Sequence, residues 1–280
     1  MNSITGHIKI LRPLNLIIGA ITVLISASIL QQLNEFSTVL LIIGIVVSYN
    51  AAANVINDYC DIAVDRINRP ERPLIAGSVS LKTAKWLSII LFTFGSLLAT
   101  LLPLEAIVVA ILIAMPLMVL YSYCLKGLPL VGNVSIAFTL GLTFIFTGVS
   151  LGSWQPMLIP AMLAFSLTLV RELVKDIADF DGDKSADLTT FPILVGIKRA
   201  AQLVIMLAIL TIIGTLIPYI MGYFGIAYLI LLILGVEIPL IVIVLSFVKK
   251  PSNITAKRAA ALLKFSTIAG LLAVWAGSVY

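Results

Sequence analysis

Nine long apolar runs constrain this sequence more than any other feature. The runs are Leu14–Leu30, Val39–Ala53, Leu87–Leu102, Ala106–Tyr121, Val134–Leu151, Met157–Val170, Ala201–Tyr219, Ile226–Val248 and Ala259–Val279. A helix needs about 20 apolar residues to cross a bilayer, and the shorter runs continue into polar segments that keep helical spacing. The runs are unbroken rather than alternating, which disfavours a membrane β-barrel. We therefore predict an all-α polytopic membrane protein with nine transmembrane helices.

The overall composition supports the same class. Hydrophobic residues make up 61% of the chain and charged residues only 11%, whereas a soluble domain has about 25% charged residues. A soluble enzyme and a disordered chain are therefore excluded, and two cysteines are too few for a disulfide scaffold. We expect membrane lipids around the chain, and the sequence indicates neither a nucleic acid nor a protein partner.

The basic residues are sorted between the two sides of the predicted bundle. Four connections contain no Lys or Arg: Gln31–Ser37, Pro103–Glu105, Gly152–Pro156 and Met221–Gly225. All 18 basic residues fall before the first helix or near the alternate connections. Cytoplasmic loops carry the excess of Lys and Arg. We therefore predict a multi-pass cell-membrane protein with a cytoplasmic N-terminus and a C-terminus outside.

Ten of the 13 acidic residues lie in two short segments, where the second and sixth predicted helices end. Both segments contain the pattern D-x2-D-x3-D, first as Asp58, Asp61 and Asp65 and again as Asp176, Asp179 and Asp183. At 100° per residue each trio shares one narrow helix face. The match suggests that residues 1–280 form a single domain with two pseudo-repeated halves, about 1–150 and 151–280.

Clustered carboxylates at a membrane boundary are costly to desolvate unless cations neutralise them. Magnesium prefers hard oxygen ligands, and it binds through a few carboxylates while keeping positions for phosphate oxygens. One such trio is more often a solvated cluster at the headgroup level. Two trios of identical spacing on equivalent helix ends favour a binding site, and nearby Lys and Arg residues could bind the rest of a polyanion.

The sequence resembles the UbiA superfamily of intramembrane prenyltransferases over nearly its whole length. Asn57-Asp58-x-x-Asp61-x-x-x-Asp65 matches the first aspartate-rich motif of that superfamily, and Asp176-x-x-Asp179-x-x-x-Asp183 matches the second. Three shorter matches accompany them: Arg12-Pro13, Tyr123-x-x-Lys126 and Thr190-Phe191-Pro192. Two motifs at this separation are much more specific than either alone.

The resemblance implies nine helices around a central cavity, with the active site on the cytoplasmic side. It also implies transfer of a prenyl group from its diphosphate with Mg²⁺, two ions in all, as cofactor. The stretches DRINRPERPLIAGSVS and RELVKDIADFDGD look most like the archaeal branch of the superfamily. That branch transfers a geranylgeranyl group to the hydroxyl of geranylgeranylglyceryl phosphate, which forms an ether lipid precursor and releases diphosphate. The expected partners are thus a prenyl diphosphate donor and a lipid-like acceptor.

Site residues follow from the matched motifs. The two aspartate-rich motifs supply the catalytic set, in which Asn57, Asp61 and Asp65 should hold one metal ion and Asp179 and Asp183 the other. Asp58 and Asp176 are ligands of second choice or orienting groups. The diphosphate should contact Lys126 and Tyr123, with Arg66 and Arg72 beside it. Arg12, Lys9 and Asn15 are expected to bind the anionic end of the acceptor.

The sequence leaves two alternative functions open. The same chemistry could act on an aromatic acceptor, as in the quinone, haem and chlorophyll branches of the superfamily. A membrane transporter is a different class, but transporters usually place their ion sites near the bilayer midplane. The acids of this chain crowd one boundary, which favours an enzyme.

Overall fold

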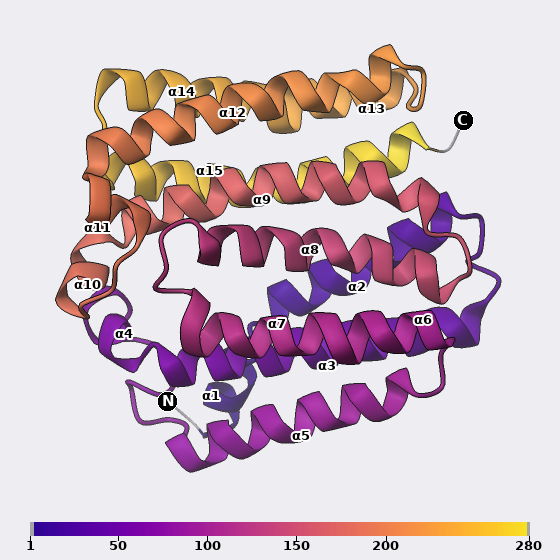
Figure 1. Ribbon diagram of the computed structural model, residues 1–280, viewed down its shortest axis with the longest axis horizontal. Coiled ribbons are helices and arrows are strands. Elements are labelled where there is room, and N and C mark those ends of the chain that lie inside the picture. The colour runs from indigo at the N-terminus through magenta and orange to yellow at the C-terminus, as the bar shows by residue number, and fades with distance from the viewer. Residues whose placement is uncertain (1–2, 279–280) are drawn as a thin grey trace. The chain divides into compact units, whose positions relative to one another are not determined.

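The structure is a computed structural model that describes residues 3–278, and these residues form helices joined by turns and loops, with no strand among them. The elements are α1 (Ser3–Ile10), α2 (Pro13–Ile29), α3 (Phe36–Cys60), α4 (Ile62–Asn68), α5 (Leu81–Ala99), α6 (Leu104–Ile107), η1 (Val108–Ala114), α7 (Met115–Leu120), η2 (Tyr121–Leu125), α8 (Val131–Ser150), η3 (Gln155–Met157), α9 (Leu158–Ala178), α10 (Phe180–Ser185), α11 (Phe191–Val195), α12 (Ile197–Ile220), α13 (Ile226–Leu232), η4 (Ile233–Glu237), α14 (Ile238–Lys249) and α15 (Asn253–Gly277) (Figure 1). Helices are the expected solution for apolar runs of this length, because a helix satisfies every backbone group within the membrane. The predicted all-α class is confirmed.

Eight of the described helices are long and apolar enough to cross a membrane, and the count rises to nine if α1 and α2 together form one span. These two helices are bent by 47° at the break between them. The second and sixth predicted runs do extend into polar sequence, as α3 and α9 show. The last predicted run ends at Val279, which lies outside the described residues. The predicted central cavity stays a prediction.

The chain divides into two compact units. The N-terminal unit comprises Met1–Lys126 and Ile145–Trp154, and the C-terminal unit comprises Gly127–Phe144 and Gln155–Tyr280. Each unit contains one of the two acidic segments.

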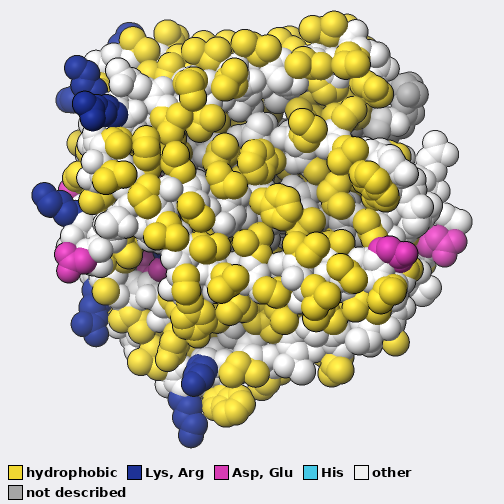
Figure 2. All heavy atoms as spheres, viewed as in Figure 1, with side chains coloured by type: hydrophobic (Ala, Val, Ile, Leu, Met, Phe, Trp, Pro, Cys, Tyr) yellow, Lys and Arg dark blue, Asp and Glu magenta, His cyan; other side chains and the backbone are white. Residues whose placement is uncertain are grey.

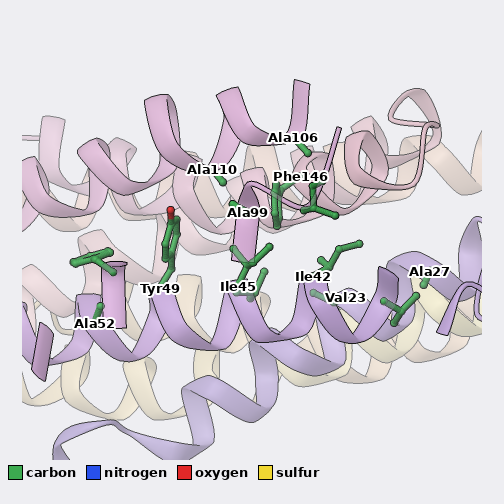
Figure 3. Packing of buried hydrophobic residues seen from close by; sticks show 14 residues of the cluster. Val23, Ala27, Ile42, Ile45, Tyr49, Ala52, Ala99, Ala106, Ala110 and Phe146 are labelled. Atoms are coloured by element: carbon green, nitrogen blue, oxygen red, sulfur yellow. The ribbon is translucent and has the colours of Figure 1, made fainter. Parts of the chain in front are cut away.

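In the N-terminal unit, α3 packs against α2 on one side and α5 on another. Its apolar positions build a core with residues of α2, α5, α6, η1 and the end of α8 (Figure 3). Figure 3 labels Val23, Ala27, Ile42, Ile45, Tyr49, Ala52, Ala99, Ala106, Ala110 and Phe146. The Tyr49 hydroxyl lies 2.8 Å from that of Ser96, so this polar tip is satisfied within the core. The core anchors the polar end of α3, where the first acidic segment begins.

In the C-terminal unit, α9 packs against α12 and α15, and α13 also packs against α15. Glycines allow η4 to approach α15 closely and α8 to approach α9 closely. A Cβ atom added at Gly235 would lie 2.3 Å from the Cβ of Ala269, and one added at Gly141 would lie 2.8 Å from the carbonyl oxygen of Ala161. The packing fixes α9, whose polar end carries the second acidic segment.

Two spans contain a π-helical stretch just before a proline. The η1 stretch precedes Pro116, and the η4 stretch precedes Pro239. Proline has no backbone N–H to donate to the carbonyl four residues earlier, and that carbonyl belongs to Leu112 in η1 and to Gly235 in η4. The wider hydrogen bonding of a π-helix is a common local adjustment inside α-helices, and here it accommodates each proline.

Large apolar side chains cover much of the surface. Figure 2 shows hydrophobic side chains over most of the face that it presents, with the few visible charged side chains near its margins. Ile220, Leu101 and Met162 are each at least two-thirds exposed. Patches of this extent on a soluble monomer are rare. The chain is therefore a multi-pass membrane protein, as its sequence predicts.

Candidate active site

The two acidic segments share a helix break at the same position of the motif. The long helix α3 ends at Cys60 and the short helix α4 begins at Ile62, so Asp61 lies between them with φ −89° and ψ 10°. In the other segment α9 ends and α10 begins around Asp179, whose φ is −94° and ψ 7°. Both aspartates occupy the sparsely populated bridge region. Each trio therefore spans a helix break. The sequence pattern, in contrast, predicts that each trio lies on one face of a continuous helix.

Helical hydrogen bonds nevertheless continue across each break. The backbone N–H of Asp61 donates to the carbonyl of Asn57, and that of Asp65 donates to the carbonyl of Asp61. The N–H groups of Asp179 and Asp183 make the same pattern with Lys175 and Asp179. The middle and last aspartates of each trio therefore keep their helical offset. The predicted repeat of two halves stays a prediction, and this local equivalence favours it.

In the N-terminal unit, the three aspartates of the first motif are buried and paired with basic side chains. Asp58, Asp61 and Asp65 are each less than 7% exposed. Arg72 contacts all three carboxylates: its Nη1 bonds to Asp65, lies 3.0 Å from Asp58 and 4.0 Å from Asp61. Lys126 bonds to Asp61 and Arg12 bonds to Asp58. Buried charge of this kind needs such pairing, and the predicted diphosphate ligands Lys126 and Arg72 supply it.

Arg12 reaches Asp58 through an unusual backbone conformation. Its φ is 55° and its ψ 69°, which places a non-glycine residue in the left-handed region at a cost of about 1–2 kcal/mol. The residue lies between α1 and α2, directly before Pro13, and its guanidinium forms an ion pair with the Asp58 carboxylate. A strained residue persists where the surrounding contacts determine it. The ion pair and the proline provide those contacts here.

Two buried oxygens in the first segment have no hydrogen-bond partner among residues 3–278. They are Oδ1 of Asn57 and Oδ1 of Asp65. Amide and carboxylate oxygens are the hard ligands that Mg²⁺ accepts, so this donor set fits the predicted ion. Among residues 3–278, no three His, Cys, Asp or Glu side chains are arranged to hold one metal ion. A metal here would therefore depend on fewer carboxylates, with Asn57 and substrate oxygens as further ligands.

Burial raises the pKa of the Asp65 carboxyl above its ordinary value. Arg72 opposes the shift, whereas the neighbouring Asp61 and Asp58 carboxylates add to it. A proton therefore competes for this oxygen up to a higher pH than at an exposed aspartate. If Asp65 binds a cation, the pH at which its carboxyl is protonated should therefore depend on the concentration of that cation.

In the C-terminal unit, neutral donors hold two aspartates of the second motif. The amide Nδ2 of Asn133 in α8 donates to Oδ2 of Asp176 at 2.7 Å. The hydroxyl of Thr190 donates to Oδ2 of Asp183 at 3.2 Å, and both residues are buried. Upstream on α9, Lys175 Nζ lies 2.6 Å from the Glu172 carboxylate. Asp176 and Asp183 are thus each held by a neutral side chain.

Some of the predicted site residues lie apart from the carboxylates. Arg66 and Tyr123 are exposed. Lys9 donates to the backbone carbonyl of Glu71 at 3.1 Å, and Asn15 lies 3.5 Å from the side chain of Asn54. Of the three predicted acceptor ligands, the structure brings Arg12 directly onto a motif aspartate.

Two residues that hold motif carboxylates were not identified from the sequence as supports. They are Asn133 and Thr190. Arg69, one of the basic residues near the first motif that could bind a polyanion, lies four residues after Asp65 on the helix, and its Nη1 lies 3.9 Å from that carboxylate. Asn133 is 43 residues from its partner, and no local pattern connects the two.

Comparison with known proteins identifies the fold. The UbiA prenyltransferase family matches residues 16–275. The digeranylgeranylglyceryl phosphate synthase of Methanosphaera stadtmanae is 39% identical over 231 residues, which cover 82% of this chain and 83% of that protein. The enzyme of the same name from Methanothermobacter thermautotrophicus is 36% identical over 272 residues, covering 97% of this chain and 95% of its own.

Solved structures agree with these relatives. A structure of digeranylgeranylglyceryl phosphate synthase in membranes matches with a TM-score of 0.76 and 32% identity, and the match covers 100% of this chain and 99% of that one. A UbiA homologue from Archaeoglobus fulgidus bound to GPP and Mg²⁺ gives a TM-score of 0.64 at 17% identity, covering 96% and 99% of the two chains. The second likeness is one of fold alone.

Proposed function

Because this chain belongs to the UbiA prenyltransferase family, we propose that it transfers a geranylgeranyl group to the hydroxyl of geranylgeranylglyceryl phosphate. The donor is geranylgeranyl diphosphate, and the products are digeranylgeranylglyceryl phosphate, an ether lipid precursor, and diphosphate. The observation that carries the proposal is the first segment, where three buried aspartates meet Arg12, Arg72 and Lys126 beside two oxygens without donors. Relatives that are 39% and 36% identical to this chain over the aligned residues are named digeranylgeranylglyceryl phosphate synthase, after this product.

The motif carboxylates would hold the metal. Asn57, Asp61 and Asp65 hold one Mg²⁺, and Asp179 and Asp183 hold a second. When bound, Mg²⁺ neutralises charge on the diphosphate oxygens as the leaving group departs. Asp58 has a different role, because its carboxylate pairs with both Arg12 and Arg72. It fixes the position of these two cations, and Asp176 is held in a similar way by Asn133.

Cations of the first segment would bind the diphosphate. Lys126 and Arg72 pair with carboxylates in the structure, and they exchange part of this pairing for phosphate oxygens when the donor arrives. Such preorganised cations stabilise charge where it develops in the transition state. Tyr123 and Arg66, which are exposed, approach the donor from outside the carboxylate cluster.

The transfer then breaks one carbon–oxygen bond and forms another. The allylic carbon leaves its diphosphate oxygen, which keeps the electron pair, and the acceptor hydroxyl oxygen bonds to that carbon and loses its proton. Arg12, Lys9 and Asn15 bind the phosphate of the acceptor, since the junction of α1 and α2 lies against the first segment through the Arg12–Asp58 pair.

A topology goes with this proposal. The N-terminus lies in the cytoplasm and the C-terminus outside, with the acidic ends of α3 and α9 on the cytoplasmic side. The support is the positive-inside distribution of all 18 basic residues. Accessibility of introduced cysteines to an impermeant reagent tests it.

The raised pKa of Asp65 yields a prediction about pH. The carboxyl must lose its proton to bind a metal ion, so kcat/KM falls as the pH drops through this pKa. The metal ion and the proton compete for the same carboxylate oxygen. A tenfold increase in Mg²⁺ concentration should therefore move the acidic side of the kcat/KM profile to lower pH by up to about one unit. Steady-state profiles at two Mg²⁺ concentrations measure the shift. An acid limb that is independent of Mg²⁺ would remove Asp65 from the metal ligands.

The proposal is tested with purified full-length protein in lipid nanodiscs. Labelled geranylgeranyl diphosphate is supplied with Mg²⁺, with and without geranylgeranylglyceryl phosphate, and diphosphate release is measured. We expect release that requires both Mg²⁺ and the acceptor. Release only with an aromatic acid such as 4-hydroxybenzoate would replace the acceptor that we propose. If no diphosphate is released under any condition, the proposal of an enzyme is contradicted and a transporter is favoured.

A further inference from the structure

The Asp183 carboxylate is held by the chain segment that follows it. Thr190 Oγ1 donates to Asp183 Oδ2 at 3.2 Å, and the backbone N–H of Leu188 donates to the Asp183 carbonyl at 3.1 Å. Asp183 is 4% exposed and Thr190 is 3% exposed. Residues 183–190 therefore form a closed loop whose two ends are joined by a buried hydrogen bond.

Thr190 makes this bond instead of the one that its position favours. It precedes Phe191, the first residue of α11, where a threonine hydroxyl usually accepts a hydrogen bond from the helix backbone. No such cap is formed at Thr190. Two other positions of the chain show the usual arrangement: Ser80 accepts from the N–H of Thr83, and Ser252 accepts from the N–H of Thr255.

The diverted hydroxyl has a stability cost. Loss of an N-cap bond typically destabilises a helix, and the hydroxyl that could form it is used to orient a carboxylate. Side chains that hydrogen-bond to metal ligands fix their orientation, and their removal typically weakens metal binding by about 10–100-fold. Asp183 is one of the two residues that we assign to the second metal ion.

We infer that Thr190 is a positioning residue: its hydroxyl holds Asp183 for binding of the metal–diphosphate donor. This inference rests on the proposed function and deepens it. Asn133 provides a parallel within the same unit, because its amide holds Asp176 from α8 at 2.7 Å. Both supports are neutral, so they orient a carboxylate without cancelling the negative charge that a cation requires.

The chain offers a matched set of variants. Thr190→Val removes the hydroxyl at nearly constant volume, whereas Thr190→Ser keeps it. Thr189→Val is the control, because Thr189 is the adjacent residue and its hydroxyl donates to the backbone carbonyl of Gly127 at 2.9 Å rather than to a carboxylate. Each full-length variant is purified, and its thermal unfolding is recorded first.

Binding is then measured without turnover. Mn²⁺ suits the same oxygen ligands as Mg²⁺, and electron paramagnetic resonance reports bound Mn²⁺ in the presence of inorganic diphosphate. We expect Thr190→Val to raise the half-saturating Mn²⁺ concentration about tenfold. Thr190→Ser and Thr189→Val should each stay within about twofold of the unsubstituted protein, since both leave the Asp183 hydrogen bond in place.

Each outcome decides the question. If Thr190→Val binds Mn²⁺ like Thr189→Val, or if Thr190→Ser is as weak as Thr190→Val, the positioning role is wrong and the proposed function stands. If the unsubstituted protein binds no Mn²⁺ with diphosphate, the metal requirement of the proposed function itself fails. Should Thr190→Val not fold, Thr190→Ala takes its place in the same comparison.

Discussion

Replacing Asp183 with asparagine should lower kcat/KM for geranylgeranyl diphosphate by about 10²–10³-fold, which corresponds to about 3–4 kcal/mol of transition-state stabilisation. The substitution keeps the size of the side chain and removes the negative charge that we assign to the second metal ion. The concentration of Mg²⁺ that gives half-maximal rate should rise as well, because a neutral amide is a weaker ligand. Steady-state kinetics over a range of Mg²⁺ concentrations measure both effects.

Asp181→Asn is the matched control for this prediction. Asp181 belongs to the same short helix α10, but it is exposed and its carboxylate accepts a hydrogen bond from Asn253 at 3.0 Å. We expect Asp181→Asn to change kcat/KM by less than about twofold, as surface substitutions usually have small effects. Equal losses in the two variants would show that the charge of α10, rather than a ligand at Asp183, is responsible.

Replacing Lys126 with methionine should lower kcat/KM by about 10²–10³-fold, the range found when one preorganised donor to a developing charge is removed. Lys126 pairs with buried Asp61 in the structure, and the substitution removes a cation that we assign to the leaving diphosphate. The Mg²⁺ requirement should change far less than in Asp183→Asn. The two variants therefore separate binding of the diphosphate from binding of the metal.

Lys82→Met serves as the control for Lys126→Met. Lys82 lies in the first turn of α5, within the same unit, and it is exposed. Because Lys126→Met leaves the Asp61 carboxylate without its lysine partner, thermal unfolding of each variant is measured alongside the kinetics. A Lys126→Met protein that folds normally and transfers the prenyl group at an undiminished rate would exclude Lys126 from the diphosphate site.

Much of the fold could be predicted, because a long apolar run that crosses a membrane must form a helix to satisfy its backbone hydrogen bonds. The predicted positions of α3 and α9 and of the two acidic segments at their ends agree with the structure. The helix breaks at Asp61 and Asp179 could not be predicted in this way. Helical spacing continues across each break, so the sequence pattern is that of an uninterrupted helix.

The supports of the carboxylates depend on contacts between distant parts of the chain. Arg12 meets Asp58 from 46 residues away and adopts a left-handed backbone there. The sequence assigns Arg12, with Lys9 and Asn15, to the anionic end of the acceptor, and it gives no sign of the ion pair between Arg12 and a motif aspartate. Asn133 reaches Asp176 across 43 residues. Such pairs follow from the packing of helices, and spacing within one segment does not contain that information.

A competition between two acceptors determines which product the enzyme makes. Purified full-length protein receives geranylgeranyl diphosphate, Mg²⁺ and an equimolar mixture of geranylgeranylglyceryl phosphate and 4-hydroxybenzoate, and the products are identified by mass spectrometry. We predict a single product with the mass of digeranylgeranylglyceryl phosphate, and its loss when a chelator removes Mg²⁺. A prenylated hydroxybenzoate as the main product, or ether formation that persists without divalent metal, would contradict the account.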